Sequence, residues 1–281
     1  MQESFFRRRR RKASSNLTYQ VYASGAASFG ATSVLICGTK ECVLIDAQFT
    51  KSEAGKVADM VERSGKKLTT ILVTHGHPDH YFGVATILPR FPEAKAYAAK
   101  PVIDEIDETM TAKVAQWSPV LKDDLTDSPL APEELIGNVI ELDGEELRVS
   151  GAVQGDSNRC TYVHVPSLDL IAAGDVCFNG SHVWLADTDD VKRKAWLKTL
   201  DRMERLRPKV IIAGHKATGL TDDAKRVLAG MRTYIAEFDE AYIASARPEE
   251  IVHWMEAEFP AHENPIILKY SAEAAFAPQK P

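Results

Sequence analysis

Cysteine is scarce in this chain, with four among 281 residues. The four are scattered and form no CxxC pair, which excludes a disulfide framework. Cys37 and Cys42 flank a predicted turn and would meet if their strands form a hairpin. Buried, reduced thiols are the more ordinary outcome for such residues. We therefore expect free thiols and a cytoplasmic location.

Long apolar runs are also lacking. No segment approaches the roughly 18 consecutive apolar residues that a membrane-spanning helix needs. Hydrophobic residues nevertheless make up 44% of the chain and charged residues 26%. This composition is typical of a folded globular protein and excludes extensive disorder.

The chain has few basic residues once its N-terminus is set aside. The first 12 residues hold six basic groups, Arg7 to Arg11 and Lys12, whereas the remainder has 28 basic and 39 acidic residues, a net charge of −11. An acidic body argues against nucleic acid as a partner, because phosphate neutralisation dominates that affinity. The arginine run could be a binding arm or the start of a twin-arginine signal, but residues 13–20 lack the apolar segment of a signal. We predict a disordered basic tail over residues 1–15.

Short apolar runs alternate with helical periodicity, which predicts two β-rich halves with helices outside. Strands are expected at 17–23, 31–37, 42–46, 68–73, 94–98, 139–142, 146–149, 161–165, 168–172 and 209–213. Helices are expected at 52–65, 81–88, 100–117, 191–206 and 221–241, with a surface excursion at 118–137. No low-complexity linker separates the halves, so we predict one catalytic domain over residues 16–245.

Residues 246–281 are predicted to form a helical extension packed on this domain. Ile251, Trp254, Met255 and Phe259 recur at helical spacing and give one apolar face. The alternatives are that this face covers a homodimer interface or caps a pocket.

Three histidines and an aspartate lie within six residues, directly after an apolar run. They are His75, His77, Asp79 and His80, in a chain with eight histidines. A metal ion needs several imidazole or carboxylate ligands at about 2.0 to 2.2 Å from one point, and a short loop after a rigid strand can hold them there. His75 and His77 project to one side of extended backbone, whereas Asp79 and His80 follow Pro78, where the chain turns. One loop can thereby supply ligands to two metals.

The motif His75-x-His77-x-Asp79-His80 resembles the signature of the metallo-β-lactamase superfamily. Further landmarks occur after apolar runs in the family's order: Leu44-Ile45-Asp46, Ala173-Gly174-Asp175 and Gly214-His215. The resemblance covers about residues 17–220. It implies an α/β fold, a four-layer αββα sandwich built from two β-rich halves with outer helices.

The resemblance also implies a role for each landmark. Asp46 would lie beneath the metal loop and support its ligands. Asp175 would bridge two metals and act with Asp79 in catalysis. His215 would be the last histidine ligand, and the second site, formed by Asp79, His80, Asp175 and His215, is complete.

One landmark departs from the family pattern. Where the family has a further histidine ligand, before the strand at 161–165, this chain has Gln154. An amide oxygen is a weaker zinc ligand than imidazole, which puts the first site, with His75 and His77, in doubt. Three alternatives remain: Gln154 is a weak third ligand, this site is empty and one metal does the work, or Asp156 replaces it. We favour a working enzyme with a weakened first metal, because every other ligand is present.

The activity implied by the resemblance is metal-dependent hydrolysis. Zinc lowers the pKa of bound water to near 7 and polarises the bond under attack. We predict one or two zinc ions per chain, with iron or manganese as alternatives, acting on a small-molecule substrate. The bond would be an ester, lactone, thioester or amide, including a β-lactam. Competing functions are an iron-dependent redox enzyme, a nucleic-acid phosphodiesterase favoured only by the arginine run, and a binding protein in which Gln154 marks lost activity.

Residues that follow the landmarks are candidates for substrate contact: Tyr81, Asn179, His182, Trp184 and Lys216. Tyr81 follows the metal loop and could line the pocket. For His182, a surface position is an equal alternative to a substrate hydrogen bond. Lys216 could hold a substrate carboxylate, although a solvated side chain is the plainer expectation.

Overall fold

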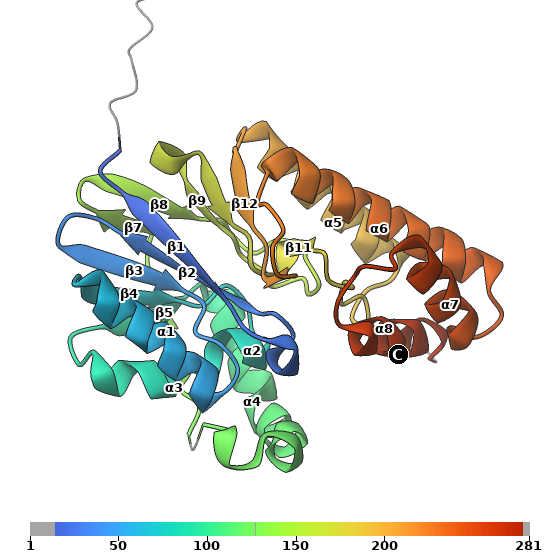
Figure 1. Ribbon diagram of the computed structural model, residues 1–281, viewed down its shortest axis with the longest axis horizontal. Coiled ribbons are helices and arrows are strands. Elements are labelled where there is room, and N and C mark those ends of the chain that lie inside the picture. Colours follow the sequence, from blue (N-terminus) through green and yellow to red (C-terminus); the bar gives the residue numbers. More distant parts are fainter. Residues whose placement is uncertain (1–14, 127, 278–281) are drawn as a thin grey trace, which may run out of the picture.

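The computed structural model describes residues 15–126 and 128–277. The first half of the chain forms a six-stranded sheet in the order β1-β2-β3-β4-β5-β6 (Figure 1). Its strands are β1 (Thr18–Ala23), β2 (Thr32–Cys37), β3 (Glu41–Ile45), β4 (Lys67–Leu72), β5 (Lys95–Ala98) and β6 (Glu133–Glu134). β1 to β3 pair antiparallel, whereas β3 to β6 run parallel. The parallel strands end at one edge, where the loops that follow them can meet.

The second half forms a five-stranded sheet in the order β12-β10-β9-β8-β7. Its strands are β7 (Val139–Leu142), β8 (Glu145–Val149), β9 (Val163–Val165), β10 (Leu170–Ala172) and β12 (Val210–Ile212). β10 and β12 are parallel neighbours, and the other pairs are antiparallel. Just beyond these strands, β11 (Phe178–Asn179) pairs with β13 (His215–Lys216).

Helices cover the outer faces of both sheets. They are α1 (Lys51–Ser64), α2 (Pro78–Tyr81), α3 (Val84–Ile87) and α4 (Lys100–Leu121) on the first, and α5 (Asp190–Arg205) and α6 (Ala224–Ala244) on the second. Local sequence explains several of their ends. The side chain of Thr50 accepts a hydrogen bond from the Glu53 N–H at the start of α1, and Gly65 ends that helix at φ 65°. The side chains of Asp189 and Asp223 cap the starts of α5 and α6, as Thr50 caps the start of α1.

Three apolar cores separate these layers. Buried side chains from both sheets, including Ile36, Val43, Leu147 and Val163, fill the space between the sheets. A second core joins the first sheet to α1 and α4, and a third joins the second sheet to α5 and α6. The resulting order of helix, sheet, sheet and helix confirms the predicted αββα sandwich (Figure 1).

The segment 118–137 is more regular than the surface excursion expected from its composition. α4 continues to Leu121, with Pro119 in its last turn. Because a proline there interrupts only the end of the hydrogen-bond ladder, the helix tolerates it. Glu133–Glu134 pairs with β5 as the edge strand β6. Two glutamates have no apolar alternation, so the sequence contains no signal for this strand.

The C-terminal residues form two helices, α7 (Pro248–Glu258) and α8 (Pro265–Phe276), rather than one. Ile251 and Met255 of α7 and Leu268 of α8 are fully buried in the core shared by α5 and α6. Their apolar side chains thus pack on the body of the chain, where α7 lies against α6 (Figure 1). Trp254, expected on the same face, is 37% exposed.

The four cysteines are free and buried. Cys37 and Cys42 are partners in the register of the β2–β3 hairpin, so the predicted hairpin forms without a disulfide. Within the described ranges, no helix combines the length and the apolar character needed to cross a membrane. Residues 1–14 of the tail predicted over residues 1–15 lie outside the described residues.

Candidate metal centre

The histidine-rich loop begins where β4 ends, and Asp46 directly follows the neighbouring strand β3. In the second sheet, Asp175 and His215 follow the ends of the parallel neighbours β10 and β12. The two halves are joined here, because the N–H of Thr32 in β2 donates to the carbonyl of Gly214 at 2.7 Å. Strand ends from both sheets therefore bring side chains that are distant in sequence to one place.

His75, His77, Asp156 and Asp175 form a first ligand group, in which one ligand atom from each lies within 4.8 Å of the others. Nδ1 of His77 is 2.8 Å from Oδ2 of Asp156. Nε2 of His75 is 3.6 Å from Oδ2 of Asp175. Two imidazoles and two carboxylates converging in this way are a suitable donor set for zinc.

Asp79, His80 and His215 form a second ligand group. Nε2 of His215 is 3.3 Å from Oδ2 of Asp79, and Nε2 of His80 is 3.8 Å from the same atom. Asp175 also reaches this group, because Oδ1 is 3.1 Å from Nε2 of His80 and Oδ2 is 3.1 Å from Nε2 of His215. The Asp175 carboxylate therefore lies between the two groups.

Hydrogen bonds outside the two groups orient the imidazoles. Asp46 accepts from the N–H and the hydroxyl of Thr74, both at 2.8 Å, and its Oδ2 lies 2.8 Å from Nδ1 of His80. Nδ1 of His215 lies 2.9 Å from the carbonyl oxygen of Phe29. A carbonyl oxygen can only accept, so Nδ1 of His215 carries a proton and Nε2 is the ring nitrogen that faces the ligand groups. Both histidines thus present Nε2 to the centre. At metal sites, a hydrogen bond to the other ring nitrogen commonly orients a ligating histidine in this way.

Four buried atoms of the two groups make no hydrogen bond of good geometry among the described residues, although imidazoles and carboxylates of the groups lie close to one another. They are Nε2 of His75, Nε2 of His80, Oδ2 of Asp156 and Oδ1 of Asp175. An unsatisfied buried polar group costs about 1 to 3 kcal/mol. All four belong to the converging ligand sets, so bound cations would satisfy them together. The residues present therefore fit a metal centre.

The centre is strongly polarised. Burial by itself would raise the pKa of Asp175, but the imidazoles of His215, His80 and His75 hold it well below its usual range. Burial would lower the pKa of His215, but the carboxylates of Asp175 and Asp79 raise it to about 9. The carboxylates are thus ionised at neutral pH and favour positive charge between them, which is the environment that a cation needs.

Gln154 and Asp156 share one loop but have different surroundings. The amide nitrogen of Gln154 donates to the carbonyl of Gly155 at 2.9 Å. Asp156 is fully buried, and its Oδ1 accepts from Sγ of Cys160 at 3.1 Å while Oδ2 faces His77. This geometry corresponds to one of the three alternatives, the one in which Asp156 replaces the missing histidine; that the first metal is weakened stays a prediction. Sequence alone contains the aspartate but not the loop geometry that turns it inward.

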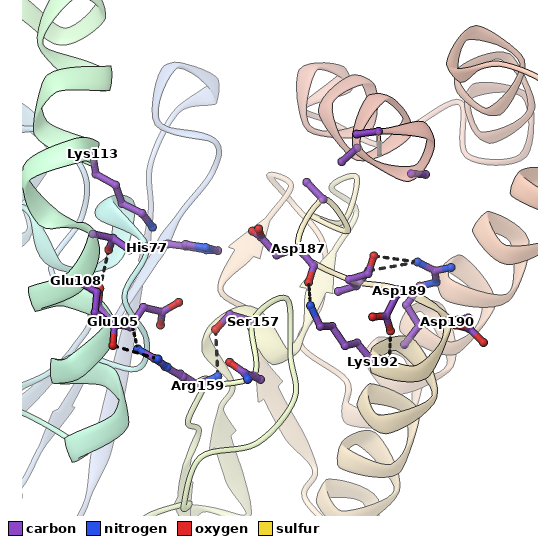
Figure 2. Close-up of a pocket in the computed structure, with 18 of the residues that line it drawn as sticks. His77, Glu105, Glu108, Lys113, Ser157, Arg159, Asp187, Asp189, Asp190 and Lys192 are labelled. Carbon is purple, nitrogen blue, oxygen red and sulfur yellow. Dashed lines mark hydrogen bonds and ion pairs between the residues drawn. The ribbon is translucent and has the colours of Figure 1, made fainter. Parts of the chain in front are cut away.

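A pocket with a volume of 1040 Å³ opens beside His77 (Figure 2). α4 forms one wall with Glu105 and Lys113, and the segment that precedes α5 forms the opposite wall with Asp187. Arg159 lies between these walls on the loop that follows Asp156. Sequence analysis missed Lys113 and Arg159, because only the fold brings their elements to the metal loop.

Trp184 and Tyr81 were both predicted to contact substrate, and they have opposite environments. The ring centroid of Trp184 is 6.3 Å from that of His77, and its Nε1 donates to Asp187 at 2.7 Å, so it lies beside the first ligand group. Tyr81 is fully buried in the core beneath the first sheet and packs edge-on against Phe82. Tyr81 therefore belongs to the core rather than to the pocket wall.

The other predicted contacts are engaged elsewhere. The amide nitrogen of Asn179 donates to the backbone carbonyl of Thr221. Asn179 lines a separate pocket of 310 Å³. Nδ1 of His182 lies 2.9 Å from the hydroxyl of Tyr234, and His182 is buried. Nζ of Lys216 pairs with Asp222 at 2.7 Å. Proximity in sequence to Asp175 and His215 suggested these residues, but each has a partner within the protein.

A family model described as "Metallo-beta-lactamase superfamily" matches residues 28–215 of this chain. Two curated relatives are hydroxyacylglutathione hydrolases. That of Blochmanniella pennsylvanica (strain BPEN) is 40% identical over 57 residues, which are 20% of this chain and 21% of that protein. That of Aeromonas salmonicida (strain A449) is 36% identical over 66 residues, 24% of each chain. The matches thus span about a quarter or less of these relatives' length.

Solved structures share the fold at low sequence identity. A metallo-beta-lactamase family protein from Thermus thermophilus has a TM-score of 0.64 and 20% identity, covering 90% of this chain and 91% of that one. A sec-alkyl sulfatase also has a TM-score of 0.64, with 16% identity over 91% of this chain and 48% of its own. The metallo-beta-lactamase FIM-1 from Pseudomonas aeruginosa, in its mono-zinc form, has a TM-score of 0.57 and 16% identity, covering 79% and 91%.

Proposed function

The chain belongs to the metallo-beta-lactamase superfamily, and we propose that it is a metallo-hydrolase that uses zinc to cleave an ester or thioester bond of a small molecule. The observation that carries the proposal is the pair of buried ligand groups that meet at Asp175. A purely structural polar cluster would satisfy its own atoms with hydrogen bonds, whereas four buried ligand atoms here make none of good geometry among the described residues.

Two zinc ions would be held by the side chains of the two groups. The first would be bound by His75, His77 and Asp156, the second by Asp79, His80 and His215, with Asp175 shared between them. Zinc supplies a Lewis acid and a water whose pKa is lowered to near 7. That the FIM-1 structure is a zinc form supports this choice of metal.

The chain's own residues then position the reacting groups. Burial would raise the pKa of Asp79, but His80 and His215 lower it, so its carboxylate is ionised and its Oδ2 can accept a proton. Asp46 holds the ring of His80 through Nδ1 and thereby fixes the direction of Nε2. Trp184 lies beside the first ligand group, and α4 forms a wall of the pocket that opens next to it. These roles together suit attack on an acyl carbonyl.

A thioester or ester is favoured because the curated relatives hydrolyse hydroxyacylglutathione, an acyl thioester. The amide of a β-lactam is the second candidate, since several similar structures are β-lactamases. Both substrates present a carbonyl to the same groups, so the geometry of the centre allows either.

The test is metal analysis combined with a substrate panel. We expect the purified chain to retain about two zinc ions after dialysis against a mild chelator, and to hydrolyse a lactoyl thioester of glutathione faster than a β-lactam. The Asp79→Asn variant should keep the fold and lose at least about 100-fold in kcat, as removal of a general base does. Retention of iron in place of zinc would favour the redox alternative, and a chain that retains no metal would contradict the proposal.

A further inference from the structure

Lys113 is a cation of the pocket that lies against the metal loop. It stands on α4, and its Nζ donates to the carbonyl oxygen of Gly76 at 3.2 Å. Gly76 separates His75 from His77, and both Lys113 and His77 line the pocket. Figure 2 shows the Lys113 side chain reaching from the helix toward His77. The ammonium group is therefore beside the first ligand group.

The two guanidinium groups of the pocket are already paired. Arg159 pairs with Glu108 at 2.8 Å, and Arg193 pairs with Asp239 at 2.5 Å. Between residues 15 and 277, apart from residue 127, no ion pair joins Lys113 to a carboxylate; its hydrogen bond is to Gly76. An ammonium has three N–H donors, and the Gly76 carbonyl takes one. Lys113 is thus left with a charge and donors to offer to a ligand.

The position is unfavourable for an unpaired charge. Lys113 is half-buried, and burial lowers the pKa of its ammonium, while Glu105 and Asp79 act in the opposite direction. A partly desolvated cation gains free energy when an anion pairs with it. A ligand anion in the pocket would supply that partner.

We infer that Lys113 binds a carboxylate of the substrate while the scissile carbonyl lies at the ligand groups. This inference rests on the proposed function, since it concerns the same pocket, and it defines the substrate as a carboxylate-bearing ester or thioester. A carboxylate is favoured over a phosphate dianion because Glu105, Glu108 and Asp187 also line the pocket. One lysine in an acidic surrounding matches a single negative charge better than two.

The experiment compares two probes that differ in one charge, 3-mercaptopropionate and its methyl ester. Both have a thiol that binds zinc, but only the first has a free carboxylate. We expect the zinc-loaded wild type to bind the acid at least about tenfold more tightly than the ester in calorimetry, as a hydrogen bond to a charged group provides. Lys113→Met should abolish this preference without weakening the ester. Lys113→Arg should restore most of it.

Lys192→Met is the matched control, because Lys192 lines the same pocket but donates to the carbonyl of Asp187 at 2.9 Å. It should keep the preference for the acid. A Lys113 that only supports the loop through Gly76 would, when changed to Met, lower zinc content and weaken both probes equally. That result, or a preference that persists in Lys113→Met, would overturn the inference.

Failure of the proposed function has a different signature, since zinc would not be retained and the methyl ester would not bind. In that case, binding of glutarate, a dicarboxylate without a thiol, to the zinc-free chain tests the inference. Binding that weakens about tenfold in Lys113→Met and not in Lys192→Met supports a carboxylate site at Lys113. Equal binding by the wild type and both variants, or no binding at all, refutes it.

Discussion

Oδ2 of Asp156 lies 2.8 Å from Nδ1 of His77, in the first ligand group, where the family resemblance had pointed to Gln154. The Asp156 side chain is fully buried and held from behind by the thiol of Cys160. A carboxylate is a charged ligand, whereas an amide is neutral, so this exchange adds negative charge to the first group. We therefore propose that Asp156 compensates locally for the departure from the family pattern, two residues further along the chain.

Asp156→Ala should remove one of the two zinc ions, because it deletes a charged member of the first ligand group. We expect zinc content to fall from about two ions per chain to about one, and kcat to fall at least about tenfold. Elemental analysis after dialysis measures the first and steady-state kinetics the second. Gln154→Ala is the control and should retain both ions. If Gln154→Ala loses zinc and Asp156→Ala does not, our assignment of the ligand is wrong.

Asp46→Asn should weaken zinc binding by about 10- to 100-fold without unfolding the chain. Asp46 has φ 60°, a conformation that asparagine also tolerates, so the backbone need not change. An asparagine amide has one accepting oxygen and one donating NH2 group, so it cannot accept on both sides, from Thr74 and from His80, as the carboxylate does. The His80 ring therefore loses its orientation. Competition with a chromogenic chelator measures the affinity. Asp143→Asn, at an exposed aspartate with φ 52°, should leave it unchanged.

Gly214→Ala should disrupt the centre from the backbone side. A Cβ at this position would lie 2.0 Å from Oδ1 of Asp175 and 2.6 Å from the carbonyl carbon of Gly174. We expect a loss of about 1 to 3 kcal/mol in the free energy of unfolding, together with impaired zinc retention. Gly55→Ala in α1 meets open space and should instead add about 0.5 to 1 kcal/mol. Urea unfolding of the two variants separates these outcomes, and equal effects would contradict the steric argument.

His182 should make stability depend on pH. Burial and the neighbouring His262 lower the pKa of His182 to about 4, below its value of 6.5 in an unfolded chain. The unfolded state therefore binds the proton first, and stability present above pH 6.5 is lost as pH falls toward 4. Between pH 7.5 and pH 4, we expect the free energy of unfolding of His182→Asn to fall by about 1 kcal/mol less than that of the wild type.

The measurement is urea unfolding of zinc-free protein at several pH values, so that metal release does not contribute. His253→Asn, at an exposed histidine of α7, is the control. Parallel pH profiles for the wild type and His182→Asn would mean that the buried ring does not stay neutral.

Much of the ligand set was accessible from sequence because each member directly follows a strand. Period-2 and period-3.6 patterns located most strands and helices, and the density of histidines after one strand pointed to His75 and Asp79, whereas Asp175 and His215 were named only through the family resemblance. β6 and the division between α7 and α8 were missed, because paired glutamates and a short turn leave no periodic signal.

What the sequence by itself determined were the features that depend on neighbouring residues: the strands, the helix caps and the chemistry of the metal loop. The tertiary structure alone decided that Asp156 joins His77, that Lys113 of α4 reaches Gly76, and that Lys216 is paired with Asp222. Except for the last, these contacts join residues dozens of positions apart. They depend on how the two sheets pack and how their loops turn, and a local pattern contains no information about either.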